Sequence, residues 1–386
     1  MNNAVYTRWH RLLTIGLIPL LLVSLTGCWG SQDIQSQAYA TAIGLDYENG
    51  EYVTYVQVLN FGNVARSEKI EIGKGLPIWL GKARNLLLSE ALTTIHFTSQ
   101  LPMFWGHVRI VVCTERFLRM KGLQTAYNAM NRYREIRYNI YLYGTKEKLE
   151  DLFTQKSILN ESPIDSLIAN PKQVYEPLSS NQITARINEP GNPAVLPSIS
   201  LDGSVWKEDK KGKPMFRIDG GYFFTDRQYG GWMSIDELEG MKWRQNKLRD
   251  IGIMVPAKHP YASLMIKKSR LKITPIWEAG EMKFDIHVKL KGFVMELLDD
   301  VAMDQLVNDA NEVIRASIQH SFQVGVEKKC DPFALQQAFY RKFPKIWDRM
   351  GGKSEFMLKS DSLRNIHVKL DILHTGKYKG RTANDR

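Results

Sequence analysis

The alternation of apolar and polar residues is clearest in the last third of the chain. Phe284, Ile286, Val288 and Leu290 are apolar, whereas the residues between them are charged or polar. A period of two predicts a β-strand with one buried and one wet face. Further strands are predicted at 262–269, 270–278 and 365–372. Successive strands with only short turns between them predict an antiparallel sheet.

Helical spacing appears between and after these strands. A helix is predicted from about Val301 to Phe322, with Asp299 or Asp300 as its cap. A second helix is predicted to begin at Asp331-Pro332, since proline is favoured at the first helical position, and to end before Pro344. The inward face of the first helix should carry Val307, Ala310, Ile314, Ser317 and Ile318.

The first third mixes the two periods. A hairpin is predicted from "AYATAIGL" and "YVTYVQVLNF", because Asn49-Gly50 between them favours a tight turn. Residues 78–92 have the spacing of a helix. A strand around 108–112, a helix over 115–130 and a half-buried strand over 136–142 follow.

The centre of the chain changes in texture. Residues 157–197 are rich in Pro, Asn and Ser and predict an irregular crossing between domains. "GGYFFTDRQYGGWMSIDELEGMKW" predicts two short strands followed by a helix. Ser234 and Glu237 stand three residues apart at the start of that helix, which is the spacing of a capping box.

Together these elements predict an α+β fold of about three domains, each a mostly antiparallel sheet with helices packed on it. We expect an N-terminal domain over 28–196 and a middle domain over 197–255, which either stands alone or shares strands with the first. A C-terminal domain over 256–380 and a basic tail over 381–386 complete the division.

The chain begins with the pattern of a secretory signal. Arg8 and Arg11 precede a 14-residue apolar run from Leu12 to Leu25. As a helix this run spans only about 21 Å, against about 30 Å of bilayer hydrocarbon, although a retained membrane anchor is the alternative. "LTGC" has the form of a lipobox, in which Cys28 receives a diacylglyceryl group and becomes the first residue. We therefore expect residues 1–27 to be a signal peptide and Cys28 to be a lipid anchor.

Charge and cysteine content limit the remaining possibilities. The net charge is +11, and residues 327–386 carry 14 Lys and Arg against 7 Asp and Glu. A basic end could attract anionic lipid, but a solvated lysine face is the favoured interpretation. No motif indicates nucleic-acid binding. For Cys113 and Cys330 we expect two buried free thiols, with a disulfide as the alternative.

The sequence offers no convincing catalytic constellation. It contains no GxSxG, no P-loop, no GxGxxG and no HExxH motif. His287 and His367 lie on the polar faces of their strands, where solvent-exposed side chains are expected. We therefore expect neither a cofactor nor a metal site, and no enzymatic activity.

Three segments resemble one family. "LTGCWGSQDIQSQAYATAIGLDY" looks like the lipobox and following segment of the Ger(x)C spore-germination lipoproteins. "GGYFFTDRQYGGWMSIDELEGMKW" is similar to the central element of that family. "FQVGVEKKCDPFALQQAFYRKFPKIWDRM" resembles its C-terminal helix pair, although Cys330 and Pro332 near the turn depart from the pattern.

The resemblance implies the C subunit of a nutrient germinant receptor, a non-enzymatic lipoprotein on the outer face of the spore inner membrane. Its partners would be two integral membrane subunits, A and B, and the bilayer that holds the acylated Cys28. Trp29 then becomes a candidate for the membrane interface, where tryptophan rings are favoured. The alternatives are a solute-binding lipoprotein of a transporter or sensor and, third, a secreted hydrolase.

Overall fold

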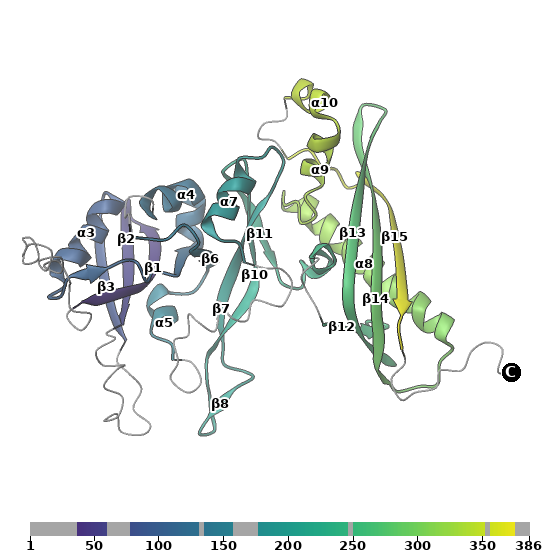
Figure 1. The fold of residues 1–386 in the computed structure, drawn as a ribbon, viewed down its shortest axis with the longest axis horizontal. Coiled ribbons are helices and arrows are strands. Elements are labelled where there is room, and N and C mark those ends of the chain that lie inside the picture. Colours follow the sequence, from purple (N-terminus) through teal and green to yellow (C-terminus); the bar gives the residue numbers. More distant parts are fainter. Residues whose placement is uncertain are drawn as a thin grey trace, which may run out of the picture.

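The computed structural model describes residues 37–59, 78–130, 135–156, 177–245, 250–351 and 356–374. They form two lobes, each built on a sheet covered by helices (Figure 1). Cys28, Trp29, the signal segment and the basic tail lie outside these residues, as do residues 157–176 of the expected crossing segment. Within the described part of the chain, no helix is both long enough and apolar enough to cross a bilayer.

The N-terminal lobe contains a nine-stranded sheet in the order β11-β10-β7-β6-β5-β1-β2-β3, with β4 paired to β1. β10 and β11 fall in the segment expected to form a middle domain, and they extend this same sheet. The strands are β1 (Ala38–Glu48), β2 (Glu51–Leu59), β3 (Trp79–Asn85), β4 (Met103–Phe104), β5 (Ile110–Thr114), β6 (Tyr141–Thr145), β7 (Ala194–Asp202), β10 (Met215–Thr225) and β11 (Gln228–Ser234). A separate hairpin joins β8 (Lys207–Glu208) to β9 (Lys211–Gly212).

The expectation of a mostly antiparallel sheet is wrong for this lobe. β1, β5, β6 and β7 pair in parallel, and antiparallel strands flank them on both sides. Parallel neighbours require crossover connections, which α4 (Glu115–Met130) provides between β5 and β6. The pattern of each strand predicts its burial but not the direction of its neighbour, so the error lies in the pairing.

Helices cover both faces of this sheet. α3 (Leu88–Thr98), α4 and α7 (Ser180–Ile187) pack against one face, where Ile43, Val111 and Leu196 contribute to the core. The short α5 (Leu149–Phe153) packs against the opposite face with Ala42 and Tyr143. The chain therefore leaves β5 toward one face and leaves β6 toward the other.

Several elements of this lobe match the sequence predictions and others do not. The hairpin is confirmed: Tyr47 pairs with Tyr52, and both Asn49 and Gly50 have the positive φ that its tight turn needs. The helix predicted over 78–92 is wrong in its first half, which forms the edge strand β3 before α3 begins. The strand predicted over 136–142 begins only at Tyr141.

The C-terminal lobe contains a four-stranded sheet in the order β12-β13-β14-β15. Its strands are β12 (Ile251–Val255), β13 (Ala262–Glu278), β14 (Glu281–Leu297) and β15 (Leu363–Ile372). β12, β13 and β14 pair antiparallel, although β12 was not among the predicted strands, and β15 adds in parallel to β14. The two strands predicted over 262–278 are one continuous strand, because a bulge at Lys267 shifts the alternation without ending the pairing.

The helix α8 (Met303–Glu327) covers one face of this sheet, and Ala310, Ile314 and Ile318 on its inward side are fully buried as predicted. The predicted aspartate cap is wrong, since Ala302 occupies the N-cap position without a side-chain hydrogen bond. α9 (Leu335–Lys342) and α10 (Pro344–Arg349) follow.

Two further helix starts differ from their predictions. α9 begins four residues after the predicted Asp331, yet the buried carboxylate of Asp331 accepts a hydrogen bond from the Gln336 N–H at 2.9 Å. The capping box of Ser234 and Glu237 is confirmed, with bonds of 2.7 and 3.2 Å. It leads into turns and the 3-10 helix η4 (Glu239–Arg244) rather than into an α-helix.

Candidate functional site

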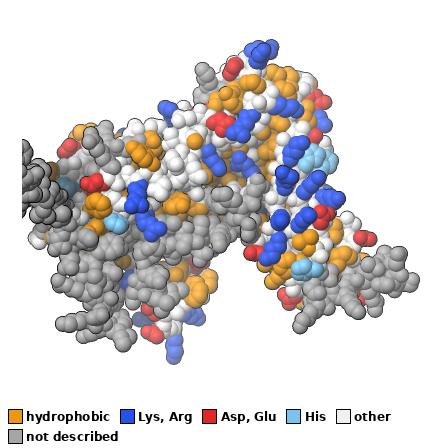
Figure 2. All heavy atoms as spheres, in the orientation of Figure 1, with side chains coloured by type: hydrophobic (Ala, Val, Ile, Leu, Met, Phe, Trp, Pro, Cys, Tyr) orange, Lys and Arg blue, Asp and Glu red, His pale blue; other side chains and the backbone are white. Residues whose placement is uncertain are grey.

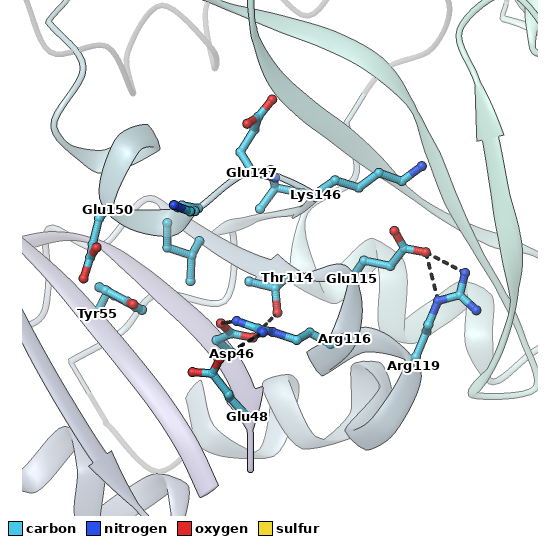
Figure 3. Close-up of a pocket in the computed structure, with 13 residues that line it drawn as sticks. Asp46, Glu48, Tyr55, Thr114, Glu115, Arg116, Arg119, Lys146, Glu147 and Glu150 are labelled. Atoms are coloured by element: carbon cyan, nitrogen blue, oxygen red, sulfur yellow. Dashed lines mark hydrogen bonds and ion pairs between the residues drawn. The ribbon is translucent and has the colours of Figure 1, made fainter. Parts of the chain in front are cut away.

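Charged side chains gather where the parallel strands of the N-terminal lobe end. The carboxyl ends of β1, β5 and β6 lie at one edge of the sheet, and ligands of open α/β sheets bind at such edges. A cavity of about 700 Å³ opens there between the beginnings of α4 and α5 (Figure 3). This edge is therefore the first candidate site.

The cavity centres on a buried carboxylate, Asp46. The guanidinium of Arg116 donates to both of its oxygens, at 2.9 and 2.6 Å, and the hydroxyl of Thr114 donates at 2.5 Å (Figure 3). Burial alone would raise the pKa of Asp46, but these bonds and the N–H of Tyr47 hold it below its ordinary value. Asp46 is thus an ionised partner of Arg116 rather than a proton donor.

Several other charges around the cavity also have partners. Glu48 pairs with Arg116 at 3.2 Å and with Arg84 at 2.8 Å. Glu115 pairs with Arg119 at 2.6 Å, and the Lys146 ammonium lies 3.2 Å from the centroid of the Trp232 ring. Such a network holds strand ends and helix starts together. We see in it a cluster that stabilises this end of the sheet.

A second cavity, of about 1090 Å³, lies between β12 and α8. Met254, Pro256, Val313 and Ala316 give it apolar walls, and His320 lies at its lining as well. The same lining contains Asp309, Glu312 and His320, and the Asp309 carboxylate accepts a hydrogen bond from the Tyr261 hydroxyl at 2.6 Å. Among all described residues, no group of three or more His, Cys, Asp or Glu is placed to hold a metal ion.

The two interior segments that carry the family resemblance meet at the junction of the lobes. Gly230 and Gly231 of β11 face the turn after α8 so closely that a Cβ on Gly231 would lie 2.7 Å from the Lys328 carbonyl oxygen and 2.9 Å from the Cys330 sulfur. Lys328 also donates to both oxygens of Glu237, each at 2.6 Å. The Gly-Gly-Trp segment therefore allows the second lobe to pack closely against the first.

Two further contacts complete this junction. The carboxylate of Glu189, just after α7, accepts hydrogen bonds from Arg341 at 2.6 and 3.0 Å and from Gln337 at 2.6 Å. Arg341 is the largest cause of the lowered pKa of Glu189. On the other side, the Gly240 N–H donates to the Ser321 hydroxyl at 2.8 Å. We use "the junction" below for these contacts of Glu189, Gly231, Glu237 and Gly240 with α8, its following turn and α9.

The remaining predicted residues fall into three groups. Cys113 and Cys330 are buried free thiols, as expected, and burial raises the pKa of the Cys330 thiol to about 12. His287 and His367 stack with ring centroids 4.7 Å apart on the polar face of their sheet, where His367 is exposed and His287 half-buried. For Cys28 and Trp29, outside the described residues, lipid anchoring and membrane contact stay predictions.

Sequence reasoning missed the pair of Asp46 and Arg116. A signal was present for Asp46, which directly follows a predicted strand in "GLDY", whereas Arg116 in "CTER" lies in the helix predicted over 115–130. Their meeting depends on β1 and β5 being parallel neighbours, which the sequence pattern did not reveal.

Comparison with known proteins gives a consistent result over both lobes. The family described as "Spore germination protein N-terminal domain" matches residues 30–201, and "Spore germination B3/ GerAC like, C-terminal" matches residues 219–376. The chain is 22% identical to spore germination protein KC of Bacillus subtilis (strain 168), covering 92% of this chain and 96% of that protein. It is also 22% identical to spore germination protein B3 of the same organism, covering 91% and 95%.

A solved structure supports the fold. The crystal structure of the GerBC protein matches 86% of this chain and 98% of its own chain, with a TM-score of 0.55 and 19% sequence identity. The two family matches cover most of the sequence between them, in the order and over the lengths that the relatives share. This chain belongs to the family of GerAC-like spore germination proteins.

Proposed function

We propose that this chain is the lipid-anchored C subunit of a nutrient germinant receptor on the outer face of the spore inner membrane. It is exported, cleaved before Cys28 and acylated on that sulfur. It then works without enzymatic activity alongside two integral membrane subunits, A and B. The observation that carries the proposal is the family match over both lobes, together with the lipobox "LTGC" at the head of the chain.

The described structure supports a scaffolding role. Most of the charged side chains that line the cavity of the N-terminal lobe form ion pairs. The junction joins the lobes through two ion pairs and buried backbone contacts. Such a two-lobed body suits a subunit that transmits contacts between partners on a membrane.

The lipid anchor is tested in spores by the variant Cys28→Ala. Each buried methylene contributes about 0.8 kcal/mol to membrane binding, so loss of the acyl chains should release or misprocess the protein. We expect an uncleaved, unacylated chain and a weakened germination response. The control Ser31→Ala lies three residues away, outside the lipobox, and should behave as the wild type. A normal response from an unacylated Cys28→Ala chain would contradict the proposal.

The partners are tested by cross-linking in isolated spore membranes, followed by mass spectrometry. Cross-links from lysines of this chain to two integral membrane subunits would support the assignment.

The variant Trp29→Ala tests the separate proposal that Trp29 lies at the membrane interface. Unchanged lipidation, membrane depth and receptor assembly in that variant would remove Trp29 from the account.

One observation favours a second candidate, a solute-binding lipoprotein. The parallel strands and the cavity at their carboxyl ends are the arrangement in which many small ligands bind. Most of the cavity's charged side chains, however, already form ion pairs, so a ligand would have to displace these pairs or bind beside Lys146, Glu147 and Lys148. Calorimetry of the protein with amino acids, sugars and nucleosides separates the two functions, since only a solute-binding protein should release heat on saturable binding.

A further inference from the structure

The outer face of the C-terminal sheet carries an unusual set of basic side chains. The buried residues of β14 face α8, so the residues between them point away from the helix and into solvent. Figure 2 shows Lys and Arg side chains gathered over β13, β14 and β15 on this side. The basic face consists of six exposed residues, Lys268, Arg270, Lys272, Lys289, Lys291 and Lys369.

The register of the sheet aligns these residues in rows across the strands. Arg270 of β13 pairs with Lys289 of β14, which in turn pairs with Lys369 of β15. One row has three like charges side by side. In the next row Lys268 pairs with Lys291. Directly opposite side chains in a sheet have Cβ atoms only about 5 Å apart, so these charges repel one another.

Nothing in the described part of the chain neutralises this repulsion by a direct ion pair. None of the six basic residues has an Asp or Glu oxygen within 4.0 Å, whereas other lysines of the same lobe do. Asp371 lies opposite Lys291 in the register but forms no such pair. Like charges aligned across strands lower the free energy of unfolding. The fold does not require these rows of basic residues, so another role must explain them.

Beyond the basic rows, the same face becomes apolar. Met265 pairs with Phe293, and Met295 of β14 is 52% exposed. A sheet face with a cationic centre and apolar side chains at one end matches the anionic headgroups and the adjoining hydrocarbon of a bilayer.

We propose that this basic face docks on a bilayer surface rich in anionic phospholipid, as a second membrane contact besides the acyl anchor. The chemistry favours lipid over a protein partner. Five of the six residues are lysines, and lysine is depleted in protein interfaces whereas arginine is enriched. Lysine acts as a strongly hydrated point charge, suited to diffuse attraction toward many phosphates rather than to one fixed bidentate pairing.

The test uses the full chain on defined vesicles and measures how fast amines react with a lysine-modifying reagent. One set of vesicles contains phosphatidylcholine alone, and the other contains added phosphatidylglycerol. Docking predicts slower modification of Lys268, Lys289 and Lys369 on the anionic vesicles only. Lys207, Lys210 and Lys211 of the distant β8–β9 hairpin are exposed internal references and should react equally on both.

A triple variant removes the central row: Arg270→Gln, Lys289→Gln and Lys369→Gln. A basic residue near an anionic surface contributes about fivefold to partitioning, so three substitutions should weaken docking about 100-fold and expose Lys268 and Lys272. The matched control, Lys207→Gln with Lys210→Gln and Lys211→Gln, changes the net charge equally and should keep the protection. The row variant should also melt no lower than the wild type, because it removes like-charge repulsion.

Three outcomes would overturn the proposal. The first is equal modification of the basic face on both kinds of vesicle. The second is equal loss of protection in the row variant and the control, which would show that binding depends only on the net charge of the protein and not on the basic face. The third is protection that needs co-reconstituted integral membrane subunits rather than anionic lipid, which would make the face a protein interface. The first two outcomes come from vesicles that contain no other receptor subunit, so they would leave the proposed receptor function standing.

Discussion

At the scale of single residues, Asp46 shows how a buried charge is tolerated. Its carboxylate lies at the end of β1, where Arg116 and Thr114 replace the hydrogen bonds that water would supply. Breaking a buried pair by removing one partner is costly because the other charge stays without compensation. The half-exposed guanidinium of Arg116 retains some hydration, which reduces that cost.

The variant Asp46→Asn should therefore destabilise the protein by about 2 kcal/mol at neutral pH. The lowered pKa of Asp46 means that its stabilisation is present above the pKa of the unfolded chain, about 3.9, and is lost as the pH falls through the lower folded value. Urea unfolding between pH 7 and 3 measures both effects. The wild type should lose this contribution at acid pH. In the variant, the free energy of unfolding should depend less on pH, because this carboxylate is absent.

Glu150→Gln is the control for this series. Glu150 pairs with Lys82 at 2.6 Å, but both side chains are more than a third exposed, and such pairs contribute less than about 1 kcal/mol. Equal destabilisation by the two substitutions would show that Asp46 is no more than a surface ion pair.

The two interior cysteines allow a second prediction at this scale. Cys113 belongs to the core beneath α4, and Cys330 lies in the junction beside Met233 and Leu238. Burial raises the pKa of both thiols, so neither should be nucleophilic in the folded protein. Alkylation followed by mass spectrometry should modify neither cysteine in the native chain and both after denaturation without reductant. A requirement for reductant would indicate a disulfide instead.

At the scale of elements, local patterns predicted what each segment buries better than what it pairs with. The alternation in β14 correctly predicted that Phe284, Ile286, Val288 and Leu290 are buried. The apolar spacing of residues 78–92 predicts a helix. The same spacing also fits a strand followed by a helix, which is what the structure contains. In the edge strand β3 the large apolar side chain of Trp79 is 65% exposed, so apolar residues there do not mark the buried face.

The pairing of distant strands is beyond such patterns. The parallel centre of the first sheet and the basic rows of the second both depend on which strands become neighbours and in which register. The polar positions of β14 and β15 could be assigned to a wet face from sequence. That Lys289 and Lys369 stand side by side required the structure, because β15 reaches β14 only after α8, α9 and α10.

Gly240 provides the prediction for η4. A Cβ at this position would lie 2.4 Å from the Ser317 carbonyl oxygen and 2.7 Å from the Ile318 Cα, both on the backbone of α8. Rigid backbone cannot move aside cheaply, so Gly240→Ala should destabilise the protein by about 1–3 kcal/mol. Chemical denaturation measures this cost, and hydrogen exchange should show loosening of α8 at its contact with η4.

The matched control is Gly252→Ala in β12, where an added Cβ meets nothing within 4 Å. This substitution should leave the free energy of unfolding within about 0.5 kcal/mol of the wild type. A similar cost at both positions would mean that the packing of η4 on α8 is not what requires glycine.

At the scale of the whole molecule, the junction makes two sheets of different construction act as one body. The ion pair of Glu237 with Lys328 and the close contact of Gly231 with the turn after α8 connect the two interior segments that resemble the family, which gives that resemblance a structural reason. The basic face lies on the far lobe, on the side of the sheet away from α8. An acylated N-terminus and a docked basic face would together fix the orientation of this body on the membrane, whereas a single flexible tether would leave it free to turn.

The central claim is that the chain works as a lipoprotein of the spore membrane. Intact-mass and peptide analysis of the protein purified from spore inner membranes tests this most directly. The account predicts a chain that begins at Cys28, lacks residues 1–27 and carries a diacylglyceryl group on the Cys28 sulfur. A chain that retains residues 1–27 with an unmodified Cys28, or one recovered outside the membrane fraction, would contradict it.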